Sequence, residues 1–188
     1  ETLQEAGYRI ALKKCSTLIA TLLPIVGAVE VICVGRTTVF CQVQMLQHQT
    51  IAIYGAHLHH TDKDGEGSGV RLRQIQALLK HHAAKSSNNS TVIVADFNQQ
   101  RCRDYAPFEW DVVARGMKER GEPEDDNVCS RLEAAGFVCS LDAAGVVRNW
   151  PADEYPPPTH WTGTAIDYSF STGLHLHGNY VVMTNSDH

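Results

Sequence analysis

The sequence lacks the features that mark several protein classes. Its 188 residues carry 16 Lys and Arg against 21 Asp and Glu, a formal net charge of -5, so no overall positive field exists to hold a nucleic acid through charge alone. The six cysteines include no C-x-x-C pair and no zinc-ribbon spacing, which favours reduced thiols over a disulfide scaffold or a zinc ribbon. No internal repeat, linker or low-complexity tract occurs. With 43% hydrophobic residues, the chain is expected to form a single globular domain over residues 1–188.

A long uninterrupted hydrophobic run is also missing. The most apolar stretch, from Leu18 to Val34, is broken by Pro24, Gly27 and Glu30, and a charge near the middle of a membrane is costly. We therefore expect strands at residues 16–20 and 28–34 and no transmembrane segment. The start of the chain shows no secretory signal. Together with reduced thiols, this favours a cytoplasmic or nuclear location.

The hydrophobic pattern predicts a layered α/β (α+β) architecture. Two β-branched and aromatic stretches flank a short polar connection and indicate a hairpin. Apolar residues spaced three and four apart indicate helices, and one continuous apolar run indicates a strand buried on both faces. The expected hairpin strands are residues 37–46 and 50–57, the helices 70–82 and 128–135, the strand buried on both faces 91–95, and two further strands 137–141 and 166–171.

Asp96-Phe97-Asn98 is the first segment whose side chains could form part of an active site, because it follows the buried strand. Side chains alternate along an extended backbone, so Asp96 and Asn98 are expected on one side and Phe97 in the core. The carboxylate could orient or deprotonate a water, and the amide could donate to an anionic oxygen. The alternative interpretation is a turn, which Asp and Asn commonly form at strand ends.

His57, His59 and His60 follow the second hairpin strand. His57 and His59 would share a face if the strand continued, which makes a zinc pair conceivable, but no cysteine or second histidine pair accompanies them. A single His57 that donates to a phosphate oxygen is the favoured interpretation, with His59 and His60 in solvent.

Two later segments place carboxylates at comparable positions. In Ile166-Asp167-Tyr168, burial of Ile166 and Tyr168 would point Asp167 away from that core, where it could pair with a charged group or simply face solvent. Asp187 and His188 end the chain together, a pattern that is otherwise typical of an exposed tail.

Taken in order, these segments resemble the endonuclease/exonuclease/phosphatase superfamily, which has the DNase I-like fold. The similarity runs from about Val39 to His188 and includes an R-x-x-Q helix, Arg71 to Gln74, after the histidine strand. The resemblance implies a four-layer sandwich of two mixed β-sheets packed face to face with helices outside. It also implies cleavage of phosphate esters that depends on Mg²⁺, with Mn²⁺ as a substitute.

The resemblance also implies roles for individual residues. Asp96 would orient or activate the attacking water, Asn98 and His57 would contact the phosphate, and Asp187 would help to bind Mg²⁺. His188 would hydrogen-bond the scissile phosphate or share in acid/base work, held in its tautomer by Asp167. The pattern does not decide which residue is the base. A hard cation with few carboxylate ligands suits Mg²⁺ chemistry.

The start of the chain departs from the family pattern. Leu3-Gln4-Glu5 spells the family segment whose Glu is the principal metal ligand, but Gly7-Tyr8 follows almost at once. The segment is therefore also consistent with the last turn of a helix that Gly7 terminates, and this interpretation is favoured. If the segment is a helix end, the metal-binding Glu would precede residue 1, and the domain would be trimmed at both ends.

The substrate is constrained only weakly. Arg101 and Arg103 could grip a phosphate next to the scissile one, and Trp161 could stack on a base, although exposed loop arginines and a sheet-capping aromatic explain the same residues. The favoured function is a magnesium-dependent nuclease or nucleic-acid phosphodiesterase that uses in-line attack of water. The alternatives are an enzyme acting on a phosphorylated small molecule, inositol phosphate or lipid, and a catalytically silent binding module.

Overall fold

The computed structural model describes residues 2–11, 17–34, 36–45, 49–60, 69–85, 90–122, 127–143, 147–148, 158–160, 163–175 and 178–179. In chain order the elements are β1 (Arg9–Ala11), β2 (Ile19–Thr21), β3 (Ile25–Val34), β4 (Arg36–Gln44), β5 (Thr50–His57), α1 (Val70–Lys85), β6 (Ser90–Asp96), the 3-10 turn η2 (Cys102–Asp104), α2 (Pro107–Glu119), α3 (Asn127–Ala134), β7 (Val138–Cys139), β8 (Val147–Arg148), β9 (Asp167–Thr172) and β10 (Gly178–Asn179).

A six-stranded mixed sheet, in the order β3-β4-β5-β6-β9-β7, forms the centre of the fold. Strands β3, β4 and β5 pair antiparallel, which confirms the predicted hairpin between β4 and β5. Strands β5 and β6 pair in parallel, and α1 connects them, as a parallel pair requires a crossover. Strand β9 lies antiparallel between β6 and β7. The mixed sheet therefore places the ends of β5 and β6 and the start of β9 at one edge.

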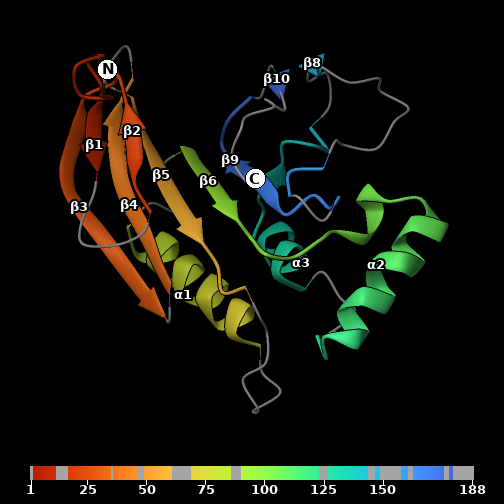
Figure 1. Cartoon of the computed structure of the whole chain (residues 1–188). Coiled ribbons are helices and arrows are strands. Elements are labelled where there is room, and N and C mark those ends of the chain that lie inside the picture. Colours follow the sequence, from red (N-terminus) through yellow and green to blue (C-terminus); the bar gives the residue numbers. More distant parts are fainter. Residues whose placement is uncertain are drawn as a thin grey trace.

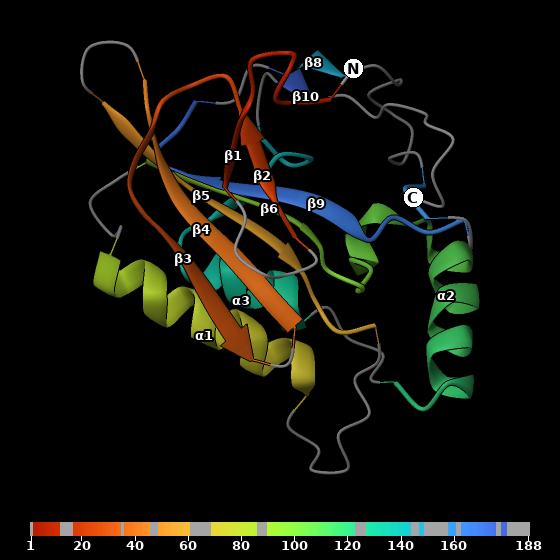
Figure 2. The same ribbon diagram turned by 60° about the vertical axis from the view of Figure 1, so that its left-hand side comes forward.

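The layers on the two faces of this sheet give the predicted α/β sandwich. Helices α1 and α3 cover one face, and the small β1–β2 sheet lies against the other face beside β3 and β4 (Figures 1 and 2). On the helical side Tyr54, Ile75 and Leu132 belong to the main core, and on the other side Ile19 and Val39 pack together in a second cluster. Among the described residues, the layer opposite the helices is this two-stranded sheet.

Two details differ from the sequence predictions. Strand β6 was expected to be buried on both faces, but Val94 is 53% exposed, because the β1–β2 sheet covers β3 and β4 and stops short of β6. Helix α2 was not predicted. Its start carries Pro107 in the first turn, and Glu109 accepts a hydrogen bond from the backbone N–H of Ala106 (2.9 Å), two signals that an amphipathic search overlooks.

The other predicted helices and strands overlap the observed ones, whereas β1, β8 and β10 were not predicted. Helix α3 ends before Gly136, whose φ of +86° is typical of the residue that terminates a helix. Strand β7 is shorter than expected, because Asp142 N–H donates to the Cys139 carbonyl (3.0 Å) and turns the chain. Cys41, Cys102 and Cys139 carry free thiols. Within the described ranges, the helices are too short or too polar to cross a membrane.

Candidate active site

Three strands of the large sheet meet at one edge, and each carries a predicted site residue there. His57 is the last residue of β5, Asp96 is the last residue of β6 and Asp167 is the first residue of β9. The register pairs His57 with Asp96 and Asp96 with Asp167. Directly paired residues project their side chains to the same face. That face is opposite α1 and α3, because the neighbouring Phe97 and Tyr168 are buried on the helical side.

The His57 imidazole is held between a cation and a carboxylate. Its Nε2 lies 3.3 Å from Asp96 Oδ2 and also contacts Arg36 Nη1. A guanidinium only donates, so the Arg36 contact requires an unprotonated Nε2, whereas a hydrogen bond to Asp96 requires a protonated one. The two contacts therefore exclude each other at any moment. Since the His57 side chain is 36% exposed, the tautomer that faces a ligand depends on which neighbour it pairs with.

Arg36, which the sequence did not single out, extends this group of side chains. It begins β4, and its Nη2 lies 3.1 Å from His60 Nδ1. The His60 ring in turn stacks on that of His59, with 4.8 Å between the centroids. His60 is exposed, as expected, and contacts Arg36 at the surface, whereas His59 is partly buried. Only the antiparallel pairing of β4 with β5 brings Arg36 to the strand end, so no local pattern could have revealed it.

Asn98 combines the two interpretations of the D-F-N segment. Its φ is +49°, in the left-handed region, so the extended alternation stops at Asp96. The Asn98 backbone N–H instead donates to Asp96 Oδ1 (2.7 Å), forming an Asp-initiated turn. The Asn98 side-chain amide donates to the Leu58 carbonyl (3.0 Å). Asn98 thus lies beside Asp96, as predicted, and also joins the segments that follow β5 and β6, while Phe97 is fully buried.

The R-x-x-Q helix holds these two segments from behind. Arg71, fully buried on α1, donates through Nη1 to the Asn98 carbonyl, and its Nη2 lies 3.7 Å from Glu122 Oε2. Gln74, one helical turn later, accepts a hydrogen bond from the His59 backbone N–H (3.0 Å). The spacing of three residues places both side chains on one face of the helix. Arg71 and Gln74 therefore support the backbone of Asn98 and His59 and are buried beneath the exposed surface of the site.

Asp167 is positioned through its backbone. The Thr159 hydroxyl accepts hydrogen bonds from the backbone N–H groups of both Ile166 and Asp167, each at 3.1 Å. Ile166 and Tyr168 are buried, and Asp167 is only partly so. The predicted orientation of Asp167 is confirmed. Thr159 is a supporting residue whose role the sequence did not indicate.

The two arginines predicted to bind substrate are occupied within the protein. Arg101 is fully buried, and its Nη2 lies 2.7 and 2.8 Å from the two Asp142 oxygens. The expectation that Arg101 grips an exposed phosphate is therefore wrong in this structure. Arg103 is half exposed and pairs with Glu133 (2.5 Å) and Asp142 (3.5 Å), so a phosphate would have to compete with these partners.

Glu5 does not reach the site. Its Oε2 accepts the Thr2 backbone N–H (2.6 Å), while its own N–H approaches Thr2 Oγ1 (3.3 Å). The hydrogen bond from Thr2 N–H holds the pKa of Glu5 below its usual value. Gly7, with φ +85°, closes the turn as Tyr8 N–H donates to the Leu3 carbonyl (2.9 Å). This is the helix-end interpretation, and both views place the turn well away from the arrowheads of β5 and β6 (Figures 1 and 2).

A complete metal site is not formed by the described residues. Within those ranges, no three His, Cys, Asp or Glu side chains converge in a way that could hold a metal ion. Glu5 lies elsewhere, and Asp187 lies outside the described residues, as do His188 and Trp161. The donors present, Asp96 and Asp167, are two carboxylates at one edge, which is less than a full ligand set for Mg²⁺.

Comparison with known proteins identifies the fold. No protein-family model matches the chain, and no curated protein sequence matches it significantly. Solved structures do match, among them the human Nocturnin catalytic domain with bound sulfate anion (TM-score 0.57, 13% identity, 91% of this chain and 62% of that chain). ANGEL2, a 2′,3′-cyclic phosphatase in complex with adenosine-2′,3′-vanadate, also matches (TM-score 0.57, 12% identity, 90% and 64%).

A third match is an endonuclease/exonuclease/phosphatase family protein from Leptotrichia buccalis C-1013-b (TM-score 0.53, 15% identity, 90% of this chain and 59% of that chain). The chain thus spans less than two thirds of each of these three structures. At these identities the likeness establishes a shared fold.

Proposed function

The chain has the fold of the endonuclease/exonuclease/phosphatase superfamily, and on that premise we propose that it is a phosphate-ester hydrolase that acts on nucleic acid. The observation that carries the proposal is the meeting of His57, Asp96 and Asp167 on one face at one edge of the sheet. An imidazole and neighbouring carboxylates are the side chains that commonly transfer protons in general acid/base hydrolysis. Among the structural neighbours, the Nocturnin catalytic domain holds a sulfate anion, and ANGEL2 is in complex with adenosine-2′,3′-vanadate.

In the proposed reaction, a water oxygen attacks phosphorus in line, and the bond to the leaving oxygen breaks. Asp96 orients the attacking water. Its Oδ1 and Oδ2 each have one protein contact, which fixes the carboxylate plane, and a carboxylate oxygen has a further lone pair to offer. His57 donates to a nonbridging oxygen of the phosphate, and the second N–H of the Asn98 amide contacts the same group. His188 contacts the scissile phosphate or transfers a proton, and Asp167 holds His188 in the required tautomer.

The experiment compares turnover of the wild-type chain with that of Asp96→Asn. The substrates are single-stranded DNA, duplex DNA, RNA, an RNA with a 2′,3′-cyclic phosphate end, a 5′-tyrosyl oligonucleotide, an inositol phosphate and sphingomyelin. We expect cleavage of a nucleic-acid substrate and a loss of about a hundredfold or more in kcat for Asp96→Asn. Asp111→Asn, an exposed acid-to-amide change on α2, is the matched control and should leave kcat unchanged.

Full turnover by Asp96→Asn would remove the site from the mechanism. Cleavage of only the inositol phosphate or sphingomyelin would move the substrate to the lipid class. No turnover of any substrate would favour the binding-module alternative.

Magnesium dependence is part of the proposal, with Asp187 as the ligand contributed by this chain. A bound Mg²⁺ would neutralise charge that develops on the phosphoryl oxygens. We expect excess chelator to abolish turnover and Mg²⁺ or Mn²⁺ to restore it. Turnover that persists in excess chelator would contradict metal catalysis while leaving the roles of His57 and Asp96 open to the test above.

A further inference from the structure

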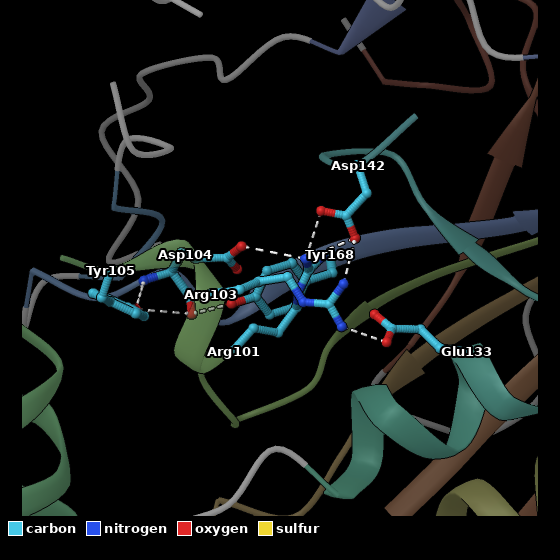
Figure 3. Close-up of polar contacts among 8 residues, drawn as sticks. Arg101, Arg103, Asp104, Tyr105, Glu133, Asp142 and Tyr168 are labelled. Carbon is cyan, nitrogen blue, oxygen red and sulfur yellow. Dashed lines mark hydrogen bonds and ion pairs between the residues drawn. The ribbon is translucent and has the colours of Figure 1, made fainter. Parts of the chain in front are cut away.

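A buried polar cluster lies directly behind the candidate site and joins three segments that are far apart in sequence. Arg101 precedes the η2 turn and Asp104 ends it, Asp142 follows β7, and Tyr168 lies on β9 next to Asp167 (Figure 3). The functional assignments so far leave this cluster without a role.

One guanidinium at the centre of the cluster serves two carboxylates. Arg101 Nη2 contacts both Asp142 oxygens (2.7 and 2.8 Å) and lies 3.3 Å from Asp104 Oδ1. The Arg101 guanidinium carbon also lies 5.6 Å from the centroid of the Tyr168 ring, within cation–π range. Arg101 and Asp104 are almost completely buried. Burying these charges costs desolvation free energy, so the ion pair alone is weak evidence that the cluster stabilises the fold.

Arg103 extends the cluster to α3. Its two Nη atoms reach Asp142 (3.5 Å) and Glu133 (2.5 Å), so Asp142 is held by Arg101 and Arg103 from different sides. The turn after β7, the η2 turn and α3 are thereby joined through side chains.

Two tyrosine hydroxyls connect the cluster to the backbone of Ala165, two residues before Asp167. Tyr168 donates to the Ala165 carbonyl (2.8 Å). The Tyr105 hydroxyl accepts the Ala165 N–H (2.9 Å) and also approaches the Ala165 carbonyl (3.4 Å). Ala165 is therefore fixed from both sides, two residues before the carboxylate. Burial raises the pKa of Tyr105 to about 12 and that of Tyr168 well above its usual value, so both hydroxyls stay protonated and able to donate.

We infer that Arg101, Asp104 and Tyr168 form a positioning device that holds Asp167 opposite Asp96. The inference rests on the proposed function, in which Asp96 orients the attacking water and Asp167 holds His188 in its tautomer at the same phosphate. Arg101 follows Asn98 by three residues, and Tyr168 follows Asp167 by one, so the buried contacts tie both strand ends to a common centre. A misplacement of about 1 Å between reacting groups costs roughly a hundredfold in rate, which is a reason to maintain a costly buried ion cluster at this place.

The experiment uses Tyr168→Phe, because removal of Arg101 would leave the buried Asp104 carboxylate without a cation and could unfold the chain. Tyr54→Phe is the matched control. It also removes a buried hydroxyl, which contacts His81 Nδ1 (3.0 Å) on α1 and has no link to Ala165. Both variants keep the aromatic ring and its packing.

We expect Tyr168→Phe to lower kcat about tenfold or more with KM within about twofold of wild type, since a change of position alters the transition state more than substrate binding. Tyr54→Phe should leave both constants unchanged. In an Asp167→Ala background, Tyr168→Phe should cause no further fall in kcat, since it acts through Asp167. An increase in KM alone, equal losses in the two tyrosine variants, or a full additional loss in the Asp167→Ala background would overturn the inference.

A second readout needs no activity. The amide resonances of Ile166 and Asp167 should shift in Tyr168→Phe and not in Tyr54→Phe. If wild-type chain cleaves none of the substrates, the proposed function fails, yet the resonances still test the coupling. Unshifted Ile166 and Asp167 amides in Tyr168→Phe would overturn it.

Discussion

At the scale of single residues, the fold changes the ionisation of Asp104. Burial raises the pKa of Asp104 to about 6, and the attraction of Arg101 and a hydrogen bond with Tyr168 offset only part of that effect. Asp142, Arg103 and Tyr105 also act on it. The offset by Arg101 is incomplete because its single positive charge is shared between Asp104 and Asp142.

This raised pKa has a consequence for stability. The folded state binds the Asp104 proton more tightly than the unfolded state, so the contribution of Asp104 to the free energy of unfolding is greatest below about pH 4. It is lost as pH rises through about 6 and is constant above that. Denaturant unfolding at pH 4 to 7.5 should show the free energy of unfolding of wild type falling by about 2 kcal/mol relative to that of Asp104→Asn. A difference that does not change with pH would contradict the raised pKa of Asp104.

At the scale of elements, the packing of β2 on β5 depends on a glycine. A Cβ at Gly55 would lie 3.1 Å from Ile19 Cγ1 and 3.4 Å from Thr17 Cγ2. Ile19 is buried and cannot move freely into solvent. The glycine therefore lets the β1–β2 sheet approach the large sheet, two residues before His57.

Gly55→Ala should accordingly lower the free energy of unfolding by about 1–3 kcal/mol, the usual cost of overpacking. The control is Gly116→Ala in α2, where the nearest atom is the flexible, exposed end of Arg120 at 3.3 Å. An alanine inside a helix should raise stability by about 0.5–1 kcal/mol. Urea unfolding measures both changes, and equal signs for the two variants would refute the packing argument.

At the scale of the whole molecule, the net charge of -5 limits how nucleic acid can bind. On the proposed function, binding would rely on a few local cations, and among the described residues Arg36 is the cation next to His57. With about two or three phosphate contacts, raising the salt concentration from 50 to 200 mM should weaken binding to duplex DNA about tenfold to fortyfold. Fluorescence anisotropy in chelator measures this without cleavage. A fall of a thousandfold or more would indicate an extended basic surface and contradict the local mode.

Much of the fold was predictable because its information is local. Alternating or continuous apolar residues marked β4, β5, β6 and β9, and the spacing of three and four marked α1. Helix α2 was not predicted. Its start is marked by a proline and a capping glutamate, and it has one buried side chain, Met117, while Phe108 and Val112 are exposed. The exposure of Val94 escaped because burial of a strand face depends on which other layer covers it.

The sequence by itself determined which residue types stand at the strand ends: His57, Asp96, Asn98 and Asp167, each marked by the apolar strand beside it. Only the tertiary structure decided their neighbours. It placed Arg36 against His57, braced Asn98 with Arg71, moved Glu5 to a separate turn and buried Arg101 behind the site. The physical reason is that strand register and side-chain pairing join residues far apart along the chain, and a local pattern carries no information about such partners.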